Sequence, residues 1–246
     1  MASGWGPFFC LEGPMMLAMR ETCWTCYRPQ NACLCESLVR LRANTHFVIL
    51  MHPKEFKREK AATGKLTHAC LPNSEILWDE SFADSKRVNE LIADPRRLSV
   101  LLYPGENSFN VSAGELPETD GRELTVFVLD GTWPCAKKML KLSPNLQRLP
   151  KLMFTPTAPS RFVIKQQPHP LCLSTIESVM ELLIALEGQG LEKQQDWLSL
   201  LKPFMAMQQY QIDASRDPTR SRYRPTGGYK DPALRGYRKS TGRKIF

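Results

Sequence analysis

The sequence of 246 residues has no long hydrophobic run. A membrane-spanning helix needs about 18–20 consecutive apolar residues, whereas the richest stretch, Ile176 to Leu186, is interrupted by two glutamates and a serine. The first 20 residues lack the pattern of a secretory signal peptide, because Arg20 is their only basic residue and Gly, Pro and Glu break the apolar stretch. We therefore expect a cytoplasmic protein without a membrane partner.

The sequence also lacks internal repeats, and most of it lacks an excess of charge. About 42% of the residues are hydrophobic and 24% are charged, which is typical of a globular protein with a sizeable core. Residues 1–215 hold equal numbers of acidic and basic side chains, so the entire net charge of +8 lies in residues 216–246. The length predicts one or two domains, preceded by an irregular segment over residues 1–20.

Residues 216–246 form a basic tail with few aliphatic side chains. The tail contains ten Lys and Arg, two Asp and three interleaved tyrosines. Such a segment cannot bury enough apolar surface to fold alone, so we expect it to be disordered. Its cations attract phosphates and its rings can stack on bases, which favours contact with RNA over a tail that merely aids solubility. The candidate RNA contacts in the tail are Arg220, Arg222, Arg224 and Arg238.

Four of the eight cysteines, Cys23, Cys26, Cys33 and Cys35, cluster within thirteen residues. Four thiolates at short spacing can close a tetrahedral zinc site, and a site without an open position is structural. An iron–sulfur cluster is an alternative, although the spacing matches neither common ferredoxin pattern. Four unrelated buried cysteines are the other alternative. The spacing thus predicts a small zinc module over residues 21–42.

Continuous apolar runs rich in β-branched residues follow the cysteine module. The longest cover residues 45–51, 99–103 and 124–129, and shorter candidates cover residues 151–155 and 161–164. Runs of this kind are typical of strands buried on both faces of a sheet. They predict an α/β domain over residues 43–215 with a mostly parallel sheet.

Helical patterns separate and follow these runs. Pro134 opens a predicted helix that extends to Leu142, since proline is tolerated in the first turn. Ser174 and Glu177 fit a capping box before an apolar helix that Gly188 or Gly190 can end. Residues 194–211 are a third candidate, with a break expected at Pro203.

Parallel α/β sheets bind ligands beyond the carboxyl ends of their strands. Two of the predicted strands end at residues 103–105 and at Asp130-Gly131-Thr132-Trp133. In the second segment, a glycine permits close approach of a ligand and a tryptophan can form the wall of a pocket. The alternative is purely structural, with Asp130 or Thr132 capping the helix that follows.

Asp130-Gly-Thr-Trp133, followed by Ala136-Lys-Lys-Met139, resembles the signature of the DTW-domain proteins. Further blocks that resemble the family occur in the same order along residues 20–190. They are the cysteine spacing, His52-Pro53 with Glu55, Thr63-Gly64, Leu102-Tyr-Pro-Gly105 and Leu173-Ser-Thr-Ile-Glu177. An ordered set of this kind is much more specific than any one motif.

The resemblance implies a tRNA-uridine aminocarboxypropyltransferase. It implies transfer of the 3-amino-3-carboxypropyl group of S-adenosylmethionine to N3 of a tRNA uridine, with release of methylthioadenosine. The implied fold is related to the SPOUT class, with a knotted C-terminal half. An RNA methyltransferase of related fold and a non-enzymatic zinc-containing RNA-binding protein are the two alternatives.

The implied reaction assigns roles to individual residues. N3 of uridine must lose a proton, and Asp130 is the candidate general base, with Thr132 and Trp133 contacting the uracil or the adenine. The start of the helix near Ser174 offers free N–H groups for the carboxylate of the cofactor. The expected cofactor-binding residues are Tyr103, Pro104, Gly105, Gly131, Ser160, Ser174, Thr175 and Glu177.

A second group of basic residues lies in the first half of the domain, close to His52 in the sequence. These side chains are candidates for contacts with tRNA phosphates, although a solvated helical face is the alternative. The expected RNA-binding residues outside the tail are His52, Lys54, Lys57, Arg58, Lys60, Lys65 and Arg161.

Overall fold

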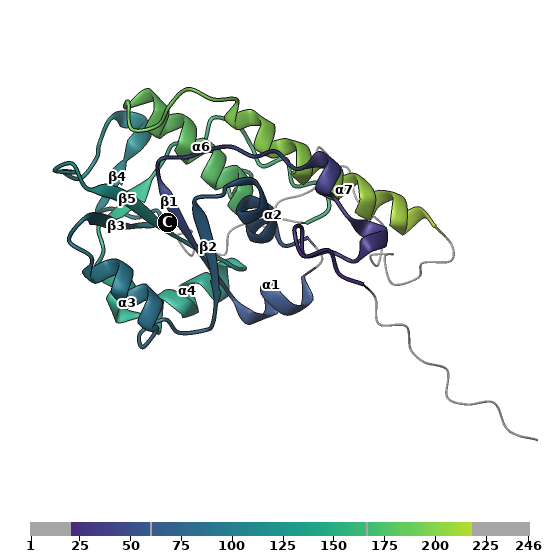
Figure 1. Cartoon of the computed structure of the whole chain (residues 1–246), viewed down its shortest axis with the longest axis horizontal. Helices are drawn as coiled ribbons and strands as arrows, with labels where there is room; N and C mark the ends of the chain where they lie inside the picture. Colours follow the sequence, from purple (N-terminus) through teal and green to yellow (C-terminus); the bar gives the residue numbers. More distant parts are fainter. Residues whose placement is uncertain (1–20, 60, 166, 218–246) are drawn as a thin grey trace, which may run out of the picture.

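The computed structural model describes residues 21–59, 61–165 and 167–217. The predicted irregular segment 1–20 and the RNA contacts predicted at Arg220, Arg222, Arg224 and Arg238 lie outside these residues. The described chain contains a six-stranded sheet of order β2-β1-β5-β3-β6-β4, in which every pairing is parallel (Figure 1). The strands are β1 (His46–Met51), β2 (Ser74–Trp78), β3 (Arg97–Leu102), β4 (Ser108–Asn110), β5 (Glu123–Asp130) and β6 (Lys151–Met153).

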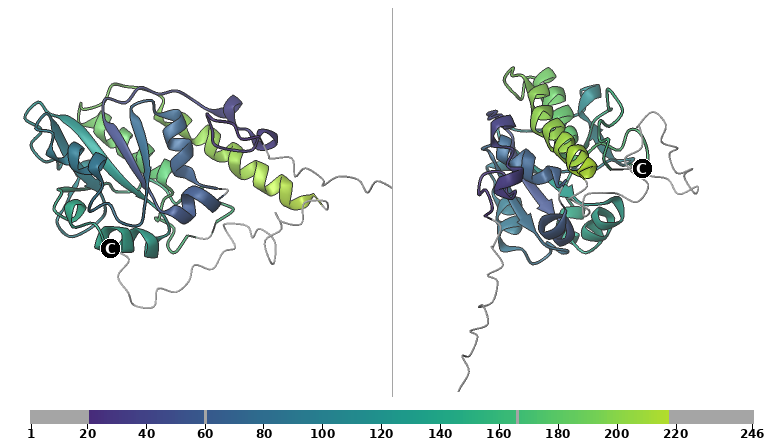
Figure 2. Two further views of the ribbon diagram at one scale, coloured as in Figure 1. Left: turned by 60° about the horizontal axis from the view of Figure 1, so that its bottom comes forward. Right: turned by 90° about the vertical axis from the view of Figure 1, so that its right-hand side faces the viewer.

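Helices cover both faces of the sheet, as Figures 1 and 2 show. α3 and α4 pack on one face, and α2, α6 and α7 pack against one another on the other face. Because parallel strands need crossover connections, helices lie between most of the successive strands. The helices are α1 (Pro53–Arg58), α2 (Thr63–Cys70), α3 (Lys86–Ala93), α4 (Trp133–Lys141), α5 (Pro144–Gln147), α6 (Thr175–Gly188) and α7 (Leu201–Arg216).

Side chains of the central strands are buried on both faces of the sheet. In β1, Phe47 packs with the core around α2, α6 and α7, whereas Val48 and Leu50 pack with the core around α3 and α4. All three are fully buried. Burial on both faces explains why the strand reads as a continuous apolar run rather than an alternating one. The α/β class and the parallel sheet predicted from the sequence are confirmed.

One predicted strand is wrong. Residues 161–164 do not form a strand, and residues 163–165 form a bend. Their backbone is paired with a side chain of α7: the N–H of Val163 donates to Oε1 of Gln208 at 2.5 Å, and Nε2 of Gln208 donates to the carbonyl of Arg161 at 3.1 Å. The side chain of Gln208 is 1% exposed. A buried glutamine thus satisfies backbone groups that a neighbouring strand would otherwise pair with.

The predicted helices are present, with one different boundary. α6 begins with the predicted capping box of Ser174 and Glu177, and Gly190 follows its end with a φ of 75°. Pro203 does not break the last helix. It lies in the first turn of α7, where a missing N–H costs nothing, and a 3₁₀ turn over Trp197–Leu200 precedes that helix.

The short elements α1, α2, α3, α5, β2 and β4 were not predicted as elements. β2 and β4 are the two edge strands, and most of their residues are only partly buried. Neither edge strand therefore has the continuous apolar pattern that marks the central strands. Among the described residues, no helix is long and apolar enough to cross a membrane.

The cysteine module packs against helices of the α/β domain. The Arg28 guanidinium lies 5.5 Å from the ring centre of Tyr210 in α7. The ring of Tyr27 lies 6.4 Å from that of His68 in α2. Figure 2 shows the module beside these helices, at the end of the molecule away from β3 and β4.

Candidate functional site

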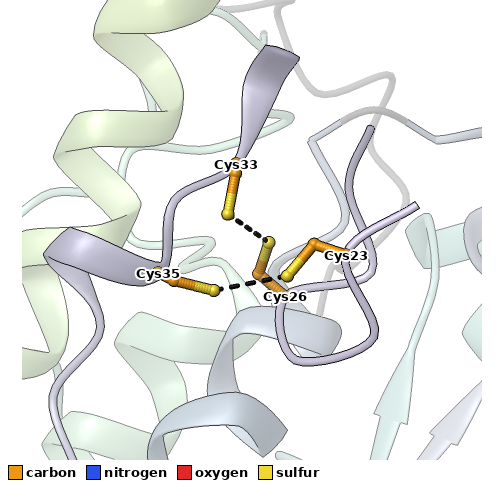
Figure 3. Close-up of side chains that lie close together, drawn as sticks. All are labelled: Cys23, Cys26, Cys33 and Cys35. Atoms are coloured by element: carbon orange, nitrogen blue, oxygen red, sulfur yellow. Dashed lines mark hydrogen bonds between the residues drawn. The ribbon is translucent and has the colours of Figure 1, made fainter. Parts of the chain in front are cut away.

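The four clustered cysteines converge on one point (Figure 3). Their Sγ atoms all lie within 4.8 Å of one another, and the pairs Cys23–Cys35 and Cys26–Cys33 are 3.4 and 3.8 Å apart. Tetrahedral zinc with Zn–S bonds of about 2.3 Å separates its sulfur ligands by roughly 3.8 Å. The four sulfur atoms therefore fit a closed zinc site.

The electrostatics of the cluster also fit a cation. Backbone N–H groups of Cys26 and Thr25 lower the pKa of Cys23 to about 6, which favours its thiolate. Burial raises the pKa of Cys26. A divalent ion offsets the cost of placing several thiolates together, one of them on a side chain that is 1% exposed.

Asp130 is the last residue of β5 and lies at the carboxyl edge of the sheet. Its side chain points to the face that α2 and α6 cover. The Thr175 hydroxyl, at the start of α6, donates a short hydrogen bond to Oδ1. Oδ2 is buried and has no hydrogen-bond partner among the described residues. Asp130 thus presents one anchored and one unpaired oxygen.

Gly64 of α2 permits this burial of Asp130. A Cβ atom at Gly64 would lie 2.6 Å from Oδ2 of Asp130 and 2.9 Å from its Cγ. Any side chain at this position would displace the carboxylate. The family-like Thr63-Gly64 pair indicated this position in the sequence, but its role becomes apparent only in the structure.

Burial makes the carboxyl group of Asp130 unusually basic. The residue is 5% exposed, and loss of hydration raises its pKa from 3.8 to about 6. The hydrogen bond from Thr175 opposes this rise, and the negative charge of Glu55 adds to it. A group with a pKa near 6 exchanges protons readily at neutral pH, as a general base requires.

Glu55 and Glu59 share one lysine beside this site. Nζ of Lys165 lies 3.6 Å from a carboxylate oxygen of Glu55 and 3.7 Å from one of Glu59. Burial raises the pKa of Glu55 as well. Sequence reasoning did not give these three residues a role, because they become neighbours only when the segment before residue 166 packs against α1.

The residues that follow Asp130 are arranged as a loop and a helix start. Thr132 is the N-cap residue of α4, but neither its side chain nor that of Asp130 caps the helix. The ring of Trp133 meets that of Tyr103 edge to face, with centroids 6.4 Å apart. Tyr103 follows β3, so the structure brings together the two segments expected at the carboxyl edge. Pro104 and Gly105 follow in the same half-buried loop.

Several residues that were predicted to bind the cofactor contact other parts of the protein instead. Glu177 is 3% exposed. Its carboxylate accepts hydrogen bonds from the hydroxyls of Ser160 and Ser174 and from the N–H groups of Ser174 and Arg161. Glu177 therefore ties the loop before residue 162 to the start of α6. At Gly131, a Cβ would lie 3.2 Å from Cβ of Cys135, so the close approach is to the chain's own α4.

His52 does not lie on the surface that was expected to contact RNA. It is 2% exposed, its Nδ1 caps α1 by accepting from the N–H of Lys54, and its own N–H donates to the carbonyl of Asp130. Lys54, Lys57 and Arg161 are exposed. Nζ of Lys65 is half-buried and donates to the carbonyl of Phe56 at 2.6 Å. Lys60 and the side chain of Arg58 lie outside the described part of the chain.

A hollow of about 450 Å³ lies beside the loop that follows β3. It is lined by residues 106–109 and 114–116. This lining includes none of the predicted cofactor residues and does not include Asp130. The hollow thus neighbours the candidate site without forming part of it.

The fold and the site define a parallel α/β protein with a buried carboxylate at the carboxyl edge of its sheet and with a four-cysteine module. A family model described as the DTW domain matches residues 20–212. The chain therefore belongs to the DTW-domain family, as the motifs indicated. No solved structure matches the chain.

Curated relatives match more than three quarters of the chain. The chain is 33% identical over 198 residues to mouse tRNA-uridine aminocarboxypropyltransferase 2, which covers 78% of this chain and 64% of the mouse protein. It is 30% identical to the Drosophila melanogaster protein of the same name, covering 79% of this chain and 76% of that protein. It is 26% identical to Arabidopsis thaliana tRNA-uridine aminocarboxypropyltransferase A, covering 77% of this chain and 81% of that protein.

Proposed function

We propose that this protein is a tRNA-uridine aminocarboxypropyltransferase that modifies N3 of a tRNA uridine, with S-adenosylmethionine as the donor. Membership of the DTW-domain family and the names of three relatives support the activity. The observation that carries the chemistry is Asp130, a carboxylate at the ligand edge of the sheet with a raised pKa and an unpaired oxygen.

The residues at this edge fit a sulfonium donor. The edge-to-face rings of Tyr103 and Trp133 offer apolar surface for an adenine, and the carboxylate of Asp130 offers negative charge near a cation. Pro104, Gly105 and Thr175 are the further residues that we assign to its binding. When bound, S-adenosylmethionine supplies the electrophilic γ-carbon of its methionine chain, and methylthioadenosine is the leaving group.

Asp130 removes the proton that blocks attack by N3. Because the carboxylate is buried, the Thr175 hydroxyl is the group through which a substrate reaches it. Thr175 passes its hydroxyl proton to Oδ1 and accepts the N3 proton. The nitrogen then forms its bond to the γ-carbon as the carbon–sulfur bond breaks, and the sulfur keeps that electron pair.

Three further assignments complete the proposal. The four cysteines hold a structural zinc ion that fixes the module against α2 and α7, since their sulfur atoms fit its geometry. The C-terminal half is knotted, as the SPOUT-related fold implies. The exposed lysines of α1 and the basic tail contact tRNA phosphates.

Nucleoside mass spectrometry tests the activity. The purified protein is incubated with unmodified tRNA and S-adenosylmethionine, and the tRNA is digested to nucleosides. We expect aminocarboxypropyl-uridine, together with methylthioadenosine in the supernatant. Methylated uridine with adenosylhomocysteine would show a methyltransferase instead, and no modified nucleoside would show a protein that only binds RNA.

A further inference from the structure

Aromatic rings and lysines contact one another in a row from the cysteine module to the carboxyl edge of the sheet. Nζ of Lys65 lies 5.9 Å from the ring centre of Tyr27 and 4.5 Å from that of Phe56. Phe56 stacks on Trp78, with centroids 5.3 Å apart and ring planes 11° apart. Nζ of Lys57 lies 4.4 Å from the ring centre of Trp78. We call these five residues, Tyr27, Lys65, Phe56, Trp78 and Lys57, the aromatic–lysine row.

The row ends beside the candidate catalytic carboxylate. Trp78 pairs with Met51 in the sheet register, and Met51 pairs with Asp130. These three residues are therefore neighbours at the carboxyl ends of β2, β1 and β5. Two strand spacings place the backbone of Trp78 about 10 Å from that of Asp130. Residues paired in register point to the same face of a sheet. Trp78 and Asp130 therefore share one face, and Figure 1 shows α1 and α2 between β2 and the module.

Both ends of the row are open to solvent. Trp78 is 45% exposed and Tyr27 is 37% exposed. Lys57 is itself exposed and places its ammonium over the Trp78 ring. A long lysine side chain can leave the ring when a planar group arrives, and its charge then remains within reach of an adjoining phosphate.

The backbone at Tyr27 is also unusual. Its φ of 57° is left-handed, a conformation that residues other than glycine rarely adopt. The turn is held by the N–H of Tyr27, which donates to the carbonyl of Cys23 at 2.8 Å. The metal-binding turn thus fixes an exposed aromatic ring at one end of the row.

We propose that the aromatic–lysine row binds unpaired nucleotides that flank the target uridine. Bases stack on Trp78 and Tyr27, and Lys57 contacts a phosphate. Aromatic rings together with cations along one track are the arrangement that holds single-stranded nucleic acid without reading its sequence. This inference rests on the proposed function and adds a role for the cysteine module, which presents Tyr27 to the RNA.

The test compares exposed aromatic residues on the two edge strands of the sheet. Trp78→Ala removes the ring of β2, and Trp78→Phe keeps a ring. Phe109→Ala is the matched control, because Phe109 lies on β4 at the opposite edge and is 37% exposed. Fluorescence anisotropy measures binding of the full chain to a labelled tRNA transcript and to a labelled single-stranded oligouridine. Thermal melting confirms that each variant is folded.

We expect Trp78→Ala to weaken binding of both RNAs by about tenfold or more, since each stacked base contributes substantially. Trp78→Phe should stay within a few-fold of the unmodified protein, and Phe109→Ala should not change binding. Lys57→Gln should lower the dependence of log affinity on log salt by about one. Tyr27→Ala should weaken oligouridine binding in the same direction as Trp78→Ala.

An unchanged salt dependence in Lys57→Gln would contradict the phosphate contact. Equal binding of both RNAs by Trp78→Ala and Phe109→Ala would overturn the row as an RNA site. That result would favour a protein partner for this surface. The outcome is separate from the proposed function, because aminocarboxypropyl transfer is measured on the unmodified protein in the same preparation. If the unmodified protein is active and Trp78→Ala binds RNA with normal affinity, the row is refuted as an RNA site and the proposed function is unaffected.

Discussion

The cysteine module and the carboxyl edge of the sheet both crowd acidic groups, but they stabilise them differently. Four sulfur atoms lie within 4.8 Å in the module, where they fit a divalent cation. At the sheet edge, Lys165 lies close to the carboxylates of Glu55 and Glu59, and burial raises the pKa of both Asp130 and Glu55. A metal ion holds its ligands permanently, whereas a carboxyl group with a raised pKa exchanges its proton. The first arrangement suits a scaffold and the second suits catalysis.

The largest effect that we expect is on catalysis at the sheet edge. Asp130→Asn keeps the shape of the side chain but cannot accept a proton, so single-turnover transfer should fall by about 10²–10⁴-fold. Affinity for tRNA should stay within a few-fold. Asp120→Asn is the matched control, because Asp120 is an exposed carboxylate paired with Arg122. Near-normal turnover by Asp130→Asn would remove Asp130 from the mechanism.

The next effect concerns the metal in the module. Cys33→Ser should lose the bound zinc, because three thiolates and a hydroxyl make a weaker set of ligands. The unfolding temperature should fall by about 5 °C or more, at about 2–4 °C for each kcal/mol lost. Metal analysis and a melting curve measure both changes. Cys135→Ser, outside the cluster, is the control, and normal zinc content in Cys33→Ser would contradict the four-cysteine site.

The raised pKa of Asp130 predicts a specific dependence of the free energy of unfolding on pH. The pKa of Asp130 is about 6 in the folded protein and ordinarily 3.8, so the folded state binds the proton more tightly. Its contribution to the free energy of unfolding should fall as pH rises from about 4 to 6, by roughly 2–3 kcal/mol, and stay constant above. Asp130→Asn has no titrating carboxyl group at this position, so its free energy of unfolding should not contain this fall between pH 4 and pH 6. Denaturant unfolding at pH 4 and pH 7.5 should therefore show the variant gaining stability only at the higher pH.

The smallest effect tests the hydrogen bond that anchors Asp130. Thr175→Ala removes the hydroxyl that hydrogen-bonds to Oδ1 and relays the proton. Because a water can occupy the vacated space and relay the proton instead, transfer should slow by only about tenfold, and loss of the hydrogen bond should raise the pKa of Asp130 further. The rising limb of the pH–rate profile should move to higher pH. Thr175→Ser keeps the hydroxyl and is the matched control. An unchanged pH profile in Thr175→Ala would show that the hydroxyl does not act on Asp130.

Some features of the protein depend only on local sequence. The four cysteines lie within thirteen residues, so their spacing alone predicted one cluster. The capping box of Ser174 and Glu177 is equally local, and the strand at residues 124–129 was evident from a run of apolar residues that is buried on both faces. Each of these patterns is set by interactions between near neighbours in the chain.

The environment of Asp130 was decided by tertiary structure. The sequence marked it as a candidate at the end of a strand, but its raised pKa depends on partners from other segments, Gly64 and Thr175 among them. The same reason explains why residues 161–164 were wrongly predicted as a strand, since Gln208 of α7 pairs with their backbone. Burial and long-range hydrogen bonds arise only when distant segments pack, and local patterning carries no record of which segments those are.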